Sequence, residues 1–295
     1  QLASSHLEAA DEEAREAVRL APDRPEPYVM LFIVKWIAAV ISLDEDPLSG
    51  LARVAHFEEM SEILKKAAQL APTHLKLRQF AITCKLTPFF VAQMVRGLGT
   101  RVGSELDEQQ KRVLSSCREE LVALANEVPS LRSELLFHAG LASFMMGDDA
   151  ATMSDLRASA DADTTKTAAL EAMVGFLVHG EKWPHALAIA EELKDRAPSG
   201  KAFCWIGRIY AEQGQWKKAE EAFRLALTYD DAKGMANLGL GVVLLKSGAE
   251  AAKAIPLLQE AQKELGDEPE VLLALAVAMT LTGQTAEGKD YAARA

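Results

Sequence analysis

Five glycines recur along this chain at a nearly constant interval. Gly147, Gly180 and Gly214 follow one another at almost equal spacing, and Gly140 and Gly207 are separated by twice that spacing. A fixed period of about 34 residues is typical of repeated supersecondary units rather than of one globular core. Each such unit cannot bury its apolar face alone, so neighbouring units must stack on one another.

The clearest copy of the repeat covers residues 200–233. Its apolar and small residues are Phe203, Ile206, Gly207, Tyr210, Gly214, Ala219, Phe223 and Ala226. This spacing resembles the tetratricopeptide repeat, with its pattern W-x2-L-G-x2-Y, then A-x3-F, then P. The resemblance implies that each copy forms two antiparallel helices, A and B. It also implies an all-α solenoid of stacked helix pairs that winds as a right-handed superhelix.

Four further copies align with this one. They cover residues 133–165, 166–199, 234–268 and 269–295, and the copies at 166–199 and 234–268 each have one extra residue in the turn. Small residues at repeat positions 8 and 20 let helices A and B approach closely, while large apolar residues fill the space between them. We therefore expect that replacing Gly140 or Gly207 at position 8 by leucine destabilises the fold.

The N-terminal part of the chain, 1–132, fits the repeat less well. Pro22, Pro72 and Pro129 each follow a stretch that looks like the end of a helix B, but they lie further apart than one repeat length. The excess falls at 44–50 and in the glycine cluster at 97–103. We therefore predict two regions, which are an irregular helical region of divergent repeats at 1–103 and a regular array at 104–295.

The composition excludes two classes of partner. Hydrophobic residues make up 49% of the chain, and its formal net charge is −11. A strongly negative protein has nothing to offset phosphate repulsion, so we expect no nucleic-acid partner. The most apolar stretch, 28–43, is short and contains Lys35. Because a bilayer-spanning helix needs about 20 apolar residues, we expect no membrane insertion by these residues.

The cysteines indicate a reducing compartment. Cys84, Cys117 and Cys204 lie far apart and form no CxxC motif, which favours reduced thiols in the core or in a groove. No signal peptide is recognisable, so we expect a cytoplasmic protein. The chain begins at Gln1 within a helical pattern. The alternative is therefore a periplasmic or membrane-anchored location if an upstream segment has been removed.

The sequence offers no catalytic constellation. The six histidines form neither an HExxH motif nor a cluster with cysteine, so we predict no metal site and no cofactor. The glycine-rich segment 97–103 looks like a dinucleotide loop. However, it follows a helix-like segment that starts at Thr87 and Pro88, whereas a dinucleotide loop follows a strand. We therefore predict that the protein is not an enzyme.

The resemblance also implies which residues line the concave wall of the solenoid, namely helix A positions 2, 5, 9 and 12, with Met145 taken at position 13. The predicted partner-binding residues are Phe137, Leu141, Met145, Leu170, Val174, Leu177, Lys201, Cys204, Arg208, Leu238, Val242, Leu245, Leu273 and Val277. Members that clamp acidic C-termini place lysine and asparagine at positions 5 and 9. Here those positions hold residues such as Leu170 and Val174, so a carboxylate clamp is not expected.

An exposed apolar wall needs a cover. The cover is either an apolar or amphipathic segment of a partner protein or another part of this chain. We predict a protein–protein interaction module acting as a scaffold, an adaptor or an assembly chaperone, with a protein or peptide as partner. The alternative is a regulatory or accessory tetratricopeptide portion of a larger enzyme or of a membrane-anchored secretion or assembly machine. The sequence pattern specifies no oligomeric state.

Overall fold

The protein is built from helical hairpins. The computed structural model describes residues 2–43, 54–96, 106–248 and 251–295. Within these ranges the regular structure is helical and no β-strand occurs, which confirms the prediction of an all-α solenoid of antiparallel helix pairs. The chain divides into two compact units, residues 1–163 and 164–295. The domain boundary predicted at residue 103 lies outside the described residues.

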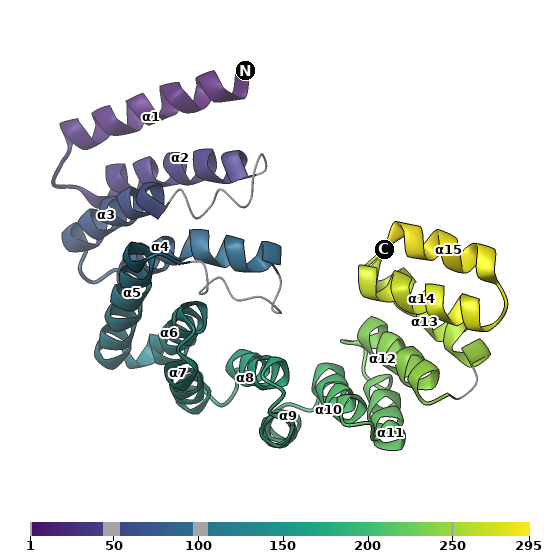
Figure 1. Ribbon diagram of the computed structural model, residues 1–295. Helices are drawn as coiled ribbons and strands as arrows, with labels where there is room; N and C mark the ends of the chain where they lie inside the picture. Colours follow the sequence, from purple (N-terminus) through teal and green to yellow (C-terminus); the bar gives the residue numbers. More distant parts are fainter. Residues whose placement is uncertain (1, 44–53, 97–105, 249–250) are drawn as a thin grey trace. The chain divides into compact units, whose positions relative to one another are not determined.

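Unit 1 comprises residues 1–163 and contains seven α-helices and one short 3₁₀ helix among its described residues (Figure 1). These are α1 (Leu2–Leu20), α2 (Pro25–Leu43), α3 (Val54–Leu70), α4 (Leu75–Arg96), α5 (Glu108–Glu127), η3 (Pro129–Leu131), α6 (Arg132–Met146) and α7 (Asp149–Ala162). Helices α1, α3 and α5 end just before Pro22, Pro72 and Pro129. Proline disfavours the helical conformation in the residue before it, which accounts for these ends.

Two apolar clusters hold unit 1 together. The larger cluster joins α4, α5 and α6 and includes Phe89, Leu121 and Leu135, each of which is completely buried. The smaller cluster lies around Met60 of α3 and includes Phe32 of α2. The two clusters therefore connect α2, α3, α4, α5 and α6 in chain order, as expected for stacked hairpins.

A buried charge ties the first three helices to one another. Lys35 of α2 is only 7% exposed. Its ammonium nitrogen lies 3.0 Å from a carboxylate oxygen of Glu59 on α3 and 3.7 Å from one of Asp11 on α1. Removing one partner from such a pair leaves an uncompensated buried charge. The lysine that interrupts the apolar stretch at 28–43 therefore serves helix packing.

Unit 2 comprises residues 164–295 and consists of four hairpins in chain order (Figure 1). Its helices are α8 (Ala168–His179), α9 (Trp183–Arg196), α10 (Gly200–Glu212), α11 (Trp216–Ala226), α12 (Lys233–Lys246), α13 (Ala251–Leu265), α14 (Pro269–Leu281) and α15 (Thr285–Arg294). Each of the four sequence copies between 166 and 295 contains one of these hairpins, and the copy at 133–165 contains α6 and α7 of unit 1.

Glycines let the helices approach each other. A Cβ atom added to Gly140 would lie 2.8 Å from Leu156, and one added to Gly207 would lie 3.0 Å from the ring of Phe223. A Cβ on Gly239 of α12 would overlap that same ring. Phe223 therefore packs between a glycine of its own hairpin and a glycine of the next one, which fixes how the two hairpins stack.

The turns between helices A and B differ in one place. After α6, α10, α12 and α14 the turn contains a glycine with φ between 69° and 84°, a conformation that glycine adopts without strain. After α8, Gly180 has φ −84°, and the left-handed residue is Glu181 with φ 53°. In this copy the left-handed position is therefore one residue after the glycine.

The N-terminus of α10 is held by the segment that follows α11 at the end of the same copy. The backbone N–H groups of Gly200 and Lys201 donate to the two carboxylate oxygens of Asp231, at 2.8 and 3.3 Å. The hydroxyl of Ser199 accepts a hydrogen bond from the backbone N–H of Ala202. A carboxylate at a helix N-terminus satisfies free N–H groups and complements the helix dipole, so Asp231 ties the end of this copy to its first helix through both effects.

Candidate protein-binding surface

The predicted wall of unit 2 lies on helices α8, α10, α12 and α14. Its positions recur at intervals of three and four residues, so they share one face of each helix. Helix α12 packs against both α10 and α14, which places Leu238, Val242 and Leu245 in a row beside Leu273 and Val277. The three predicted residues on α6, which are Phe137, Leu141 and Met145, belong to unit 1.

Five of the predicted wall residues are buried. Leu170 and Val174 on α8 are completely buried, and Leu177 is 4% exposed. Met145 on α6 and Cys204 on α10 are buried as well. In the free protein these side chains contribute to packing and present almost no surface. A contact between these five residues and a partner stays a prediction.

The cysteines behave as buried apolar groups. Cys84, Cys117 and Cys204 are buried and form no disulfide among the described residues. Burial raises the pKa of the Cys84 thiol to about 12. Burial, together with the charge of Asp231, raises the pKa of the Cys204 thiol to about 12. Such thiols are uncharged at neutral pH and therefore weak nucleophiles.

The middle of the predicted wall is partly exposed. Leu238, Val242 and Leu245 on α12 are half-buried and pack against a cluster that contains Leu258 and Leu275. In unit 1, residues 137 and 141 on α6 are also half-buried. Each of these side chains has one side on the core and the other side open.

The α14 end of the wall is the most exposed. Leu273 is 53% exposed and Val277 is 49% exposed, and Leu281 beyond them is 63% exposed. These three residues line a depression of about 350 Å³ between α14 and α15. The sequence analysis did not include Leu281. The sequence of α14, which is apolar around nearly its whole circumference, is the signal that could have identified it.

The α10 end of the wall is cationic. Lys201 and Arg208 are both exposed. The guanidinium of Arg208 lies 5.7 Å from the centre of the Trp205 ring, within the range of a cation–π contact. Partial burial and the charge of Arg208 lower the pKa of His179 on α8. Within unit 2 the wall thus changes from positively charged at α10 to apolar at α12 and α14.

Unit 1 carries a second exposed apolar surface, which the sequence analysis did not predict. Its residues are Met30, Ile33, Trp36 and Ile37 on α2 and Phe80 on α4, each between 39% and 56% exposed. The spacing of the α2 residues places them near one helix face, and the Phe80 ring meets the ring of Phe32 edge-on at 6.2 Å. The sequence analysis treated stretch 28–43 only as a possible membrane segment, although an apolar helix with one uncovered face could have been inferred from it.

Two further kinds of site are absent from the part of the chain that the structure describes. None of its helices combines the length and the apolar character that a membrane crossing needs. In the same residues, no group of three or more histidine, cysteine, aspartate or glutamate side chains is placed to hold a metal ion.

Comparisons with known proteins define the class. The best sequence copy, residues 200–233, matches the family model described as tetratricopeptide repeat. Yeast Tom70 matches over 99% of this chain and 82% of its own, with 12% identity and a TM-score of 0.51. A comparison with curated proteins finds no match. The chain is thus a helical-hairpin repeat protein, and its copy at 200–233 matches the tetratricopeptide repeat.

Other solved structures resemble parts of the chain. Pseudomonas aeruginosa pilF matches over 72% of this chain and 90% of its own, with 14% identity and a TM-score of 0.49. MamA from Desulfovibrio magneticus RS-1 matches over 54% of this chain and 90% of its own, with 15% identity and a TM-score of 0.44. At identities this low, a structural likeness concerns the fold and not the activity.

Proposed function

We propose that this protein is a non-enzymatic binding module whose α12–α14 surface receives an apolar or amphipathic segment of a partner protein. The observation that carries the proposal is the exposure of Leu273, Val277 and Leu281 on one side of α14. Each of these side chains leaves about half or more of its surface open to solvent in the free protein. Contiguous exposed apolar residues favour association, because fully burying one such side chain contributes about 1.5–3 kcal/mol.

The charge of the wall supports an amphipathic partner. Exposed Lys201 and Arg208 lie on α10, next to the helix α12 that carries the half-buried apolar row. A segment with a carboxylate near α10 and apolar side chains over α12 and α14 would complement both parts. Complementary charge contributes mainly to the association rate and to orientation, whereas apolar burial contributes most of the affinity. Scaffold, adaptor and assembly-chaperone roles all fit such a module.

Site-specific photo-crosslinking tests this function. A benzophenone amino acid is placed at Val277 and, as a matched control, at Leu225 of α11, which is 50% exposed but lies on a B helix. In extracts of the source cells we expect one dominant protein adduct at Val277 and none of that species at Leu225. Equal labelling at both positions would argue against a specific surface on α14.

A further inference from the structure

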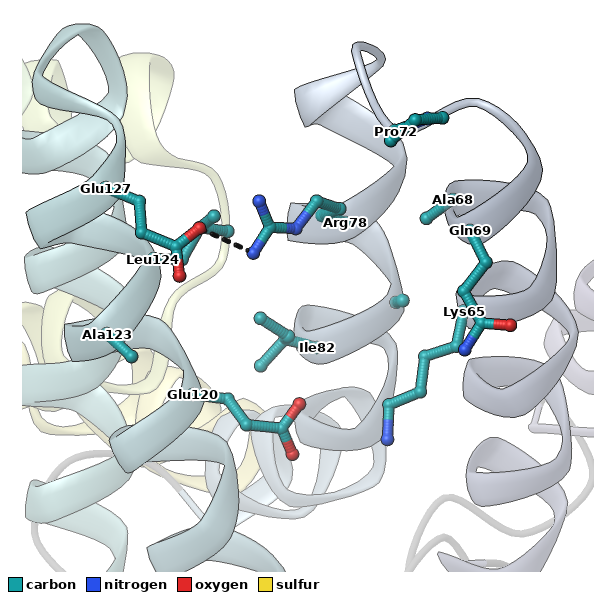
Figure 2. A pocket seen from close by; sticks show the side chains of 11 residues that line it. Lys65, Ala68, Gln69, Pro72, Arg78, Ile82, Glu120, Ala123, Leu124 and Glu127 are labelled. Atoms are coloured by element: carbon teal, nitrogen blue, oxygen red, sulfur yellow. Dashed lines mark hydrogen bonds and ion pairs between the residues drawn. The ribbon is translucent and has the colours of Figure 1, made fainter.

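Unit 1 has a groove that α3, α4 and α5 line together. Helices α3 and α5 stand on either side of α4, and a groove of about 420 Å³ lies between them (Figure 2). Because α3 and α5 end before Pro72 and Pro129, the prolines predicted to follow a helix B, the groove opens on the side of the B helices. It belongs to unit 1, whereas the α12–α14 surface belongs to unit 2, and the inference below does not depend on the proposed function.

Ion pairs mark both ends of this groove. At one end the guanidinium of Arg78 lies 2.8 Å from a carboxylate oxygen of Glu127. At the other end Glu120 lies 3.3 Å from the ammonium of Lys85. Figure 2 shows Arg78 and Glu127 on one side of Ile82, with Lys65 and Glu120 on the other side. Both carboxylates thus already have a cation beside them. A charged ligand at either end would therefore lie close to a group of its own sign, which would repel it.

The middle of the groove is apolar and lined by small residues. Ala68 of α3 and Ala123 of α5 face the space between their helices, and Ile82 of α4 lies between them (Figure 2). Larger side chains on α3 or α5 would fill such a space, since helices normally interdigitate to high packing density. The groove therefore has room for an aliphatic side chain supplied from outside.

We propose that this groove binds an extended segment of a partner protein through one uncharged aliphatic side chain that lies on Ile82. An extended backbone offers an N–H and a C=O at each residue. Arg78 and Lys65 are donors for its carbonyl groups, and Glu120 and Glu127 are acceptors for its N–H groups. The groove volume is within the range of about 300–1,000 Å³ that is usual for ligand clefts.

A peptide titration of the full chain tests the proposal. The probe is the acetylated and amidated pentapeptide Gly-Ser-Leu-Ser-Gly, and the readout is the NMR signal of the Ile82 δ-methyl group, assigned with the I82V variant. We expect a saturable shift with this peptide and an affinity at least about tenfold lower when the central leucine is replaced by glutamate or lysine. No saturable shift, or equal affinity for the charged peptides, would overturn the proposal.

Two variants locate the binding in the groove. Ala123→Trp fills the groove from an exposed position, and Ala188→Trp makes the same change at an exposed position on α9. We expect the first variant to lose the response to the leucine peptide and the second to keep it, with unchanged circular dichroism for both. Leucine-peptide binding by A123W at wild-type strength would contradict the proposal.

A third variant changes the charge of the groove without filling it. Glu127→Gln leaves Arg78 without its carboxylate, so the groove gains positive charge. We expect E127Q to bind the glutamate peptide more tightly than the wild type does. If the ratio of the affinities for the leucine and glutamate peptides were the same in E127Q and the wild type, the proposed binding in this groove would be contradicted. A shift of the Ile82 signal with protein concentration alone would identify a second copy of this chain as the occupant, which also overturns the proposal.

Discussion

At the scale of single residues, the stacking of hairpins depends on glycines, which lack a side chain and so let a neighbouring helix approach closely. The Phe223 ring is in contact range of the backbone at Gly207 and at Gly239. The contact of this ring with the glycine backbone therefore sets the distance from α11 to α10 and to α12. The period of the sequence indicates Gly207 as a close-packing position. The contact of Gly239 with the preceding hairpin requires knowledge of how hairpins stack, which one copy of a repeat does not contain.

Gly239→Ala is expected to lower the free energy of unfolding by about 1–3 kcal/mol, because the added methyl group overlaps the Phe223 ring and forces the hairpins apart. Gly180→Ala is the control, since its nearest atom would lie 3.5 Å away and its φ is negative. The control should cost nothing. Urea unfolding monitored by circular dichroism measures both, and a G239A variant as stable as the wild type would refute the packing description.

Burial at single positions also limits what the repeat pattern predicts. Val174 and Val277 both occupy repeat position 9, yet Val174 is completely buried and Val277 is half exposed. The pattern specifies the helix face on which a residue lies. It does not specify how much of that face the neighbouring elements cover, because this depends on contacts that differ from one copy to the next.

At the scale of helices, α4 and α6 are linked by a carboxylate. Glu134 of α6 lies 3.3 Å from the ammonium of Lys76 and accepts a hydrogen bond from the side-chain amide of Gln79. Burial tends to raise the pKa of Glu134, but the hydrogen bonds from Gln79 and Lys76 outweigh it, so its pKa is lowered. The sequence could not reveal this link, since α4 lies where the repeat spacing breaks down.

The Glu134 link predicts a specific dependence of stability on pH. Because the folded pKa is below the unfolded one, its contribution is fully present above the unfolded pKa and is lost as the pH falls through the folded pKa. In Glu134→Gln we expect stability at neutral pH to decrease and to fall less steeply across that acidic window than in the wild type. Urea unfolding at a series of pH values measures this, and parallel curves for the two proteins would contradict it.

At the scale of the whole molecule, the class of fold could be predicted from the sequence because its period is regular from residue 133 onward. The uneven character of the binding wall could not. The wall was predicted to be mostly apolar, whereas in unit 2 it is buried at α8, cationic at α10 and open at α14. The exposed face of α2 and the groove between α3 and α5 lie in the region with irregular spacing, where the repeat pattern assigns no positions.

The double variant Leu273→Glu, Val277→Glu tests the proposed partner surface most directly, with Leu225→Glu as the control. All three side chains are 49–53% exposed, so we expect both variants to keep a melting temperature close to that of the wild type. Binding is measured with the partner identified by crosslinking at Val277. The account predicts that the double variant loses this partner, because the new charges lose solvation without gaining a pair, while Leu225→Glu retains it. A folded double variant that binds the partner as tightly as the wild type does would contradict the account.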